Sequence, residues 1–203
     1  MSRPFSFLKS CTVGIAGAGG LGSNCAVALA RSGVGRIVVA DFDRVSLDNL
    51  NRQAFFRDQV GMKKVTALAE NIRRMNPETE VSAVDVFLEP GNVLSVFADC
   101  PVVVEAVDLA ETKRMIVETF MAERPRTWLV AASGLGGFGR NEALKTYRSG
   151  RLIVCGDQSS EVSIEMPPMA PRVGIVAHMQ ANVVLELLLD ESLIPAPAGD
   201  QDK

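Results

Sequence analysis

The chain has 203 residues, 47% of them hydrophobic and 22% charged, and 21 basic against 24 acidic residues give a net charge of −3. The apolar content excludes a disordered chain, and only four cysteines exclude a disulfide scaffold. The charge balance lacks the basic excess typical of a nucleic-acid binder, so we expect no nucleic-acid partner.

The first two thirds of the chain alternate between apolar strands and helices. Short apolar runs predict buried strands, and helical spacing or composition predicts helices between them. Strands are expected at residues 12–16, 36–40, 81–84, 102–107 and 128–132, and helices at 21–31, 62–75, 93–97 and 112–122. This alternation predicts a Rossmann-like, doubly wound α/β fold, with a mainly parallel sheet and helices on both faces.

The remainder is less regular. Tyr147 and residues 152–154 are expected in edge strands, residues 133–139 in a flexible or tightly turned loop, and residues 173–190 in a final buried helix. We expect a single domain over residues 1–194 and a disordered tail over 195–203. Because the sequence shows neither a signal peptide nor about 20 uninterrupted apolar residues, we expect a cytoplasmic protein without a membrane partner.

A glycine cluster separates the first strand from the first helix. Gly17, Gly19, Gly20 and Gly22 let a phosphate approach the backbone, and the helix N-terminus offers free N–H groups. Asp41 ends the second strand, where a carboxylate can bind ribose hydroxyls. These residues alone leave NAD, FAD, S-adenosylmethionine and ATP open as ligands.

The polar segment 42–60 and the residues just after it narrow this choice. A loop of this length is usually functional, and here Asp43, Arg52 and Lys64 add charges close to the ribose end. A hydride-transfer cofactor has little use for extra cations there. A triphosphate does, because fixed Arg and Lys side chains stabilise charge on the leaving oxygens.

Three motifs in this order, GAGGLGS, DFDRVSLDNLNRQ and GMKK, resemble the ThiF/MoeB family, relatives of the ubiquitin-activating enzymes. The likeness continues at residues 104–108 (VEAVD) and 169–188, and it is greatest to short ThiF-type proteins that activate the sulfur carrier ThiS. It implies ATP-dependent adenylation of the C-terminal glycine carboxylate of a small ubiquitin-like carrier, releasing pyrophosphate. It also implies a homodimer.

The resemblance implies a role for each matching residue. Gly17, Gly19, Gly20 and Gly22 would form the nucleotide loop, with Asp41 and Asp43 beside the ribose. The family's phosphate-contacting positions are occupied by Asn49, Arg52, Gln53 and Lys64, and its Mg²⁺ ligand by Asp108. Arg52, Lys64 and Asp108 would therefore carry the reaction. A C-terminal carboxylate with a pKa of about 3.5 is already ionised at neutral pH, so this reaction needs no general base. Such chemistry suits a chain with a single histidine.

The sequence also departs from the family. It lacks the two C-x-x-C pairs that hold zinc in longer members, so we expect no zinc; Leu109 replaces a frequent Asn, and Cys155 is expected to be a buried filler. Three alternatives stay open: a non-catalytic nucleotide-binding scaffold, an NAD-binding sensor, or another adenylating enzyme of the superfamily. That last enzyme would activate a molybdopterin carrier or a tRNA-bound carboxylate.

Overall fold

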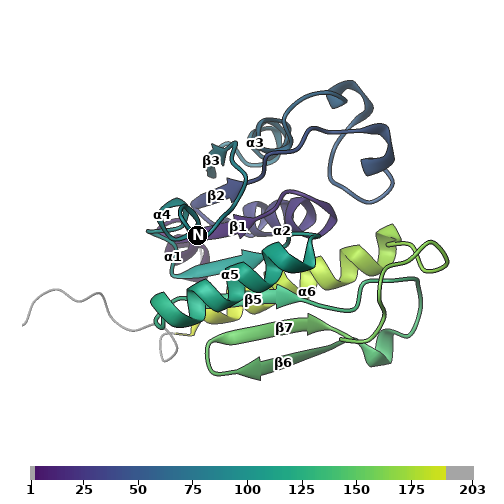
Figure 1. Cartoon of the computed structure of the whole chain (residues 1–203). Coiled ribbons are helices and arrows are strands. Elements are labelled where there is room, and N and C mark those ends of the chain that lie inside the picture. The colour runs from purple at the N-terminus through teal and green to yellow at the C-terminus, as the bar shows by residue number, and fades with distance from the viewer. Residues whose placement is uncertain (1–2, 191–203) are drawn as a thin grey trace, which may run out of the picture.

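A computed structural model describes residues 3–190 and contains one seven-stranded sheet in the order β3-β2-β1-β4-β5-β7-β6 (Figure 1). Every neighbouring pair is parallel except β6 and β7, which form an antiparallel edge hairpin. The predicted Rossmann-like α/β class is therefore confirmed. The strands are β1 (Thr12–Ala16), β2 (Arg36–Ala40), β3 (Glu80–Val84), β4 (Val102–Glu105), β5 (Trp128–Ala132), β6 (Lys145–Ser149) and β7 (Leu152–Gly156).

Helices cover both faces of the sheet and divide the core in two. On one face α2 (Gly20–Arg31), α3 (Lys64–Met75) and α6 (Ala170–Leu189) bury one apolar cluster; on the other lie α4 (Val93–Val96) and α5 (Ala110–Glu123). The central strands are buried on both faces, which explains their continuous apolar sequence. By length and composition α6 could cross a membrane, yet 56% of its most apolar window is buried inside this fold.

Several elements differ in their bounds from the sequence expectations, among them the fourth strand and the last helix. The fourth strand ends at Glu105 rather than at residue 107, because the Val107 N–H turns back to a carboxylate oxygen of Glu105 at 3.0 Å. The last helix begins at Ala170, with a proline in its first turn, and ends at Leu189. An unanticipated short helix, α1 (Arg3–Leu8), precedes the sheet, and the expected disordered tail lies outside the described residues.

The short helix α1 packs at the end of the sheet where its strands begin. The Gly35 N–H donates to the carbonyl of Leu8 at 2.9 Å, and Gly35 lies directly before β2. The carboxyl ends of β1, β2, β3 and β4 meet at the opposite edge, because Ala16 is in register with both Ala40 and Glu105. Ligands of open α/β sheets bind at that opposite edge.

Candidate active site

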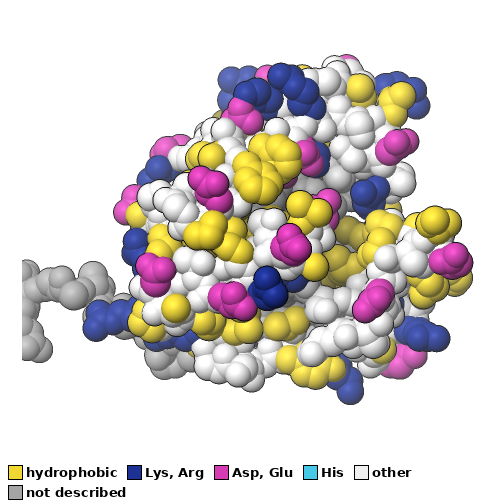
Figure 2. Space-filling view, in the orientation of Figure 1, with side chains coloured by type: hydrophobic (Ala, Val, Ile, Leu, Met, Phe, Trp, Pro, Cys, Tyr) yellow, Lys and Arg dark blue, Asp and Glu magenta, His cyan; other side chains and the backbone are white. Residues whose placement is uncertain are grey.

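A cavity of about 280 Å³ lies at the carboxyl edge of the sheet, where the chain order reverses between β1 and β4. Figure 2 shows the molecule hollowed on this side, with apolar side chains exposed inside the hollow. Reversal points are where doubly wound sheets bind ligands, because successive loops diverge there and leave a crevice. All the predicted site residues except Gly22 and Asn49 line this cavity.

The glycine loop forms one wall of the cavity. Gly17 has φ +97°, and a Cβ atom there would lie 2.7 Å from the carbonyl oxygen of Ala106. Gly22 lies behind the loop, where a Cβ would come within 1.8 Å of the carbonyl oxygen of Gly17. A side chain at Gly17 would push the loop away from the segment after β4, and one at Gly22 would push α2 away from the loop. The glycines here therefore meet a packing requirement.

Asp41 ties the glycine loop to the segment after β2. One carboxylate oxygen accepts a hydrogen bond from the Ala18 N–H and the other from the Asp43 N–H, both at 2.7 Å. Each oxygen retains a second lone pair, and the residue lines the cavity. Asp41 therefore orients two backbone segments and can still accept from hydroxyl groups of a ligand.

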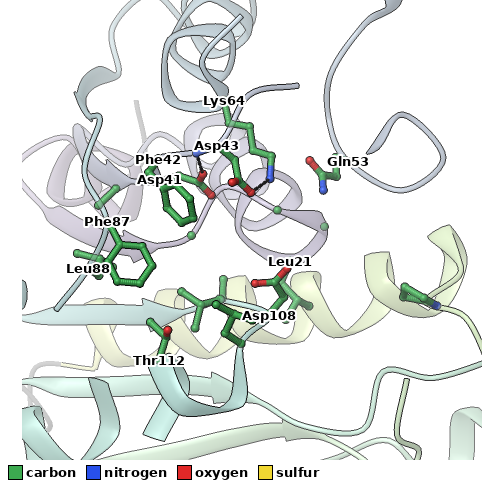
Figure 3. A pocket seen from close by; sticks show the side chains of 18 of the residues that line it. Leu21, Asp41, Phe42, Asp43, Gln53, Lys64, Phe87, Leu88, Asp108 and Thr112 are labelled. Carbon is green, nitrogen blue, oxygen red and sulfur yellow. Dashed lines mark hydrogen bonds and ion pairs between the residues drawn. The ribbon is translucent and has the colours of Figure 1, made fainter. Parts of the chain in front are cut away.

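Lys64 is the most enclosed cation of the site. Its side chain is 7% exposed, and its Nζ lies 2.7 Å from a carboxylate oxygen of Asp43, which is 44% exposed (Figure 3). The neighbouring Lys63 side chain is 43% exposed and pairs instead with Asp85. The structure thus separates the two adjacent lysines, and only Lys64 lines the cavity.

Arg52 and Gln53 approach the glycine loop from the long polar segment. The backbone carbonyl of Arg52 accepts from the Asn24 side chain at 2.9 Å, which fixes this segment against α2. Gln53 is 9% exposed, and its buried Oε1 has no hydrogen-bond partner among the described residues. A buried amide oxygen without a partner carries a free-energy cost, and here the oxygen is enclosed by protein rather than open to the cavity.

Asp108 lines the opposite side of the cavity, just beyond the end of β4. Its position depends on buried Glu105, which accepts from the Val107 N–H and forms an ion pair with Lys113. Burial raises the pKa of Glu105, against the opposing effect of the Lys113 charge. The turn that carries Asp108 is therefore held in place by the buried carboxylate of Glu105.

One end of the cavity is apolar. Phe42 and Phe87 meet edge to face with ring centroids 5.0 Å apart, and Leu88 and Thr112 lie near them (Figure 3). Phe87, Leu88 and Thr112 could not be predicted from the sequence, because each reaches the cavity from a loop or helix without a local motif. The cavity thus runs from an aromatic end to a cationic end at Arg52 and Lys64.

Asn49 lies elsewhere. Its side-chain oxygen accepts from the Ser46 N–H at 3.1 Å and caps a short 3₁₀ turn, and it does not line the cavity. Cys155 is buried, and that burial raises the pKa of its thiol to about 11, although a hydrogen bond with Thr146 opposes the change. At neutral pH this thiol is protonated, as expected of a core filler.

Comparison with known proteins matches residues 5–199 to the family model described as the ThiF family. The chain belongs to the ThiF family. Its relatives include enzymes named adenylyltransferases, in agreement with the resemblance in the glycine-loop, DFD and GMKK motifs.

Three relatives illustrate the range of this ThiF-family group. The chain is 40% identical over 135 residues to tRNA threonylcarbamoyladenosine dehydratase of Escherichia coli, covering 66% of this chain and 48% of that protein. It is 34% identical over 191 residues to adenylyltransferase and sulfurtransferase MOCS3 of Caenorhabditis briggsae, covering 89% and 46%. It is 30% identical over 188 residues to molybdopterin-synthase adenylyltransferase of E. coli, covering 89% and 74%. The chain thus spans about half the length of the first two.

The fold is similar to that of a solved ThiF-type structure. The E. coli tRNA N6-threonylcarbamoyladenosine dehydratase in complex with ATP superposes with a TM-score of 0.85 at 24% identity, covering 94% of this chain and 90% of that one. At this identity the likeness concerns the arrangement of strands and helices.

Proposed function

We propose that this protein is an ATP-dependent adenylyltransferase that activates the C-terminal glycine carboxylate of a small ubiquitin-like sulfur carrier, with a ThiS-like carrier as the first candidate. The observation that carries the proposal is that Arg52, Lys64 and Asp108 line one cavity with the glycine loop. An NAD-binding sensor would use the glycine loop and Asp41 and leave those three charged residues idle.

The cavity's polarity supports one orientation for ATP. The aromatic and aliphatic end at Phe42 and Phe87 suits the base, and Asp41 suits the ribose hydroxyls. The phosphates would then lie along the glycine loop, toward Arg52 and Lys64.

The proposed reaction needs charge stabilisation rather than proton transfer. A carboxylate oxygen of the carrier forms a bond to the α-phosphorus while the bond to pyrophosphate breaks, and no proton changes place. Two anions must approach each other, and Arg52 and Lys64 reduce their repulsion and stabilise the leaving pyrophosphate. The carboxylate nucleophile is already ionised, so the site needs no general base.

Asp108 fits a role as the protein ligand of Mg²⁺. Magnesium in nucleotide sites is usually held by one or two carboxylates together with phosphate oxygens and waters, and Asp108 is an exposed carboxylate at the cavity wall. When bound, the ion would neutralise phosphate charge. We also propose a homodimer, from the family resemblance, and a protein without zinc, from the missing C-x-x-C pairs. Metal analysis and sedimentation of the purified protein test these two proposals.

A second candidate is activation of a carboxylate on tRNA, because one relative is named a tRNA threonylcarbamoyladenosine dehydratase. The surroundings of the cavity favour a protein partner. Loops 133–139 and 157–169 border it, and their sequences contain Asp157, Glu161 and Glu165 but no Lys or Arg. A polyanion gains its affinity from cations that contact phosphates, and these loops supply none.

Carrier-dependent exchange of labelled pyrophosphate into ATP tests the proposal directly. The full chain is mixed with ATP, Mg²⁺ and, in separate reactions, ThiS-like and MoaD-like carriers, tRNA, or no partner. Exchange that requires a Gly-Gly-ended carrier supports the proposal. Exchange with tRNA alone supports the second candidate, and tight carrier binding without exchange supports the scaffold.

A further inference from the structure

Arg172 is a cation buried beside the cavity in the first turn of α6. Its side chain is 2% exposed, and its guanidinium holds two separate loops at once. Nη1 donates to the carbonyl oxygen of Gly139 at 2.8 Å, and Nη2 forms an ion pair with Asp157. The planar guanidinium is the side-chain group that can meet acceptors in two directions from fixed positions.

The two loops held by Arg172 also bind each other; we call residues 133–139 and 157–168 the loop arm. The Gly136 N–H donates to the Ser160 carbonyl at 2.9 Å, and the Gly137 N–H to the Pro167 carbonyl at 3.0 Å. A Cβ at Gly136 would lie 2.2 Å from the Glu161 carbonyl oxygen, so glycine allows this close approach. Asp157 organises one side by accepting from the Ser159 and Ser160 N–H groups at 2.9 and 2.8 Å.

The loop arm connects the cavity to an exposed apolar surface. Leu135 and Pro168 line the cavity from the inner side of the arm. On its outer side Ile164 is 95% exposed and Phe138 73% exposed. A segment of a partner that reached the cavity across this arm would contact apolar side chains, backbone and the exposed carboxylates of Glu161 and Glu165, and no cation of the arm.

The Arg172 arrangement is expensive for a purely stabilising contact. Its Nε is buried and has no hydrogen-bond partner among the described residues. Replacing a buried ion pair by apolar residues of similar volume is often neutral or stabilising, so such a pair is weak evidence of a stability role. What the pair does provide is a fixed position of two loops relative to α6.

We propose that Arg172 is a positioning residue that holds the loop arm in place against the nucleotide cavity, so that the carboxylate tail of a protein partner is guided to the nucleotide. The guidance of a partner's carboxylate tail rests on the proposed function. The fixing of the loop arm by Arg172 does not depend on it. It predicts that weakening the Arg172 contacts impairs use of the partner while nucleotide binding persists, because Arg172 does not line the cavity.

The test compares Arg172→Lys with Arg148→Lys in the full chain. Lysine keeps the charge and can still pair with Asp157. Its single ammonium cannot replace both Nη1, which donates to the Gly139 carbonyl at 2.8 Å, and Nη2, which also lies 3.5 Å from the Gly134 carbonyl. Arg148 pairs with Glu186 and packs on Trp128, away from the cavity, and provides the matched control. For each protein we would measure amide hydrogen exchange, ATP affinity by calorimetry, and pyrophosphate exchange at varied carrier concentration.

In Arg172→Lys we expect exchange of the Gly136, Gly137 and Ser160 amides to rise about tenfold or more, with the strand amides unchanged. The KM for the carrier should rise about tenfold, with kcat and ATP affinity within about threefold of wild type. Unchanged arm amides, an equal loss of ATP affinity, or the same effects in Arg148→Lys would overturn the inference. If the wild type shows no carrier-dependent exchange, the proposed function fails, and the amide measurements alone then decide whether Arg172 holds the arm.

Discussion

Replacing Lys64 by methionine gives the sharpest test of how the cavity handles charge. Methionine keeps much of the side-chain volume and removes the ammonium that lies 2.7 Å from Asp43. Two opposite unit charges about 4 Å apart attract each other by about 4 kcal/mol at an effective dielectric constant of about 20. Because the Lys64 side chain is 7% exposed, water cannot replace much of this interaction.

Only the part of that energy that increases in the transition state affects kcat. Loss of one preorganised group that stabilises developing charge typically costs about 2.7–4 kcal/mol, or about 10²–10³ in rate. We expect Lys64→Met to lower kcat by that factor. ATP affinity should fall less than about tenfold, because Arg52 and the glycine-loop amides remain.

The assay is carrier-dependent pyrophosphate exchange, with ATP binding measured by calorimetry on the same samples. Lys63→Met is the matched control, because Lys63 is the adjacent residue, 43% exposed and paired with Asp85. In the double variant Asp43→Asn/Lys64→Met, removal of the carboxylate left without its cation in the cavity should restore part of the ATP affinity. The reasoning is refuted if Lys64→Met keeps kcat within about threefold of wild type, or if Lys63→Met loses as much.

Three further outcomes follow from the contacts. In Gly22→Ala the new Cβ would lie 1.8 Å from the Gly17 carbonyl oxygen, so this variant should bind ATP at least tenfold more weakly and lose about 1–3 kcal/mol of stability. Gly174→Ala is the control, because no neighbouring group lies within 4 Å of its Cβ. Calorimetry should show unchanged ATP affinity for the control, and thermal melts an unchanged Tm. Lys113→Met leaves buried Glu105 without its cation and should lower the free energy of unfolding by about 3–5 kcal/mol, which corresponds to a drop in Tm of about 10 °C. An unchanged Tm would contradict the role of the Glu105–Lys113 pair in holding the turn that carries Asp108. Burial alone would raise the pKa of Asp157, but hydrogen bonds from Ser160 and Ser159 and the Arg172 charge lower it well below its ordinary value. Its stabilising contribution is thus complete above pH of about 4 and lost as pH falls further, so acid titration of unfolding should be shallower in Asp157→Asn than in wild type.

Local sequence was enough to predict the succession of strands along the chain and the glycine loop. These features follow from rules that act over a few residues: a buried strand is continuously apolar, and close backbone approach requires glycine. The position of Asp41 at a strand end followed from the same alternation. The carboxyl edge of the sheet could therefore be expected to collect these residues.

Tertiary structure alone decided which side chains from distant segments meet. Phe87 and Thr112 reach the cavity from separate elements, and Asn49 caps a turn instead of lining the cavity. Arg172 and Asp157 are 15 residues apart and no sequence pattern pairs them, yet they form an ion pair with side chains only 2% and 3% exposed. Such contacts depend on how β7, the glycine-rich loop and α6 pack in space. A charge must find a partner only where this packing removes it from water, and the local sequence does not show where that happens.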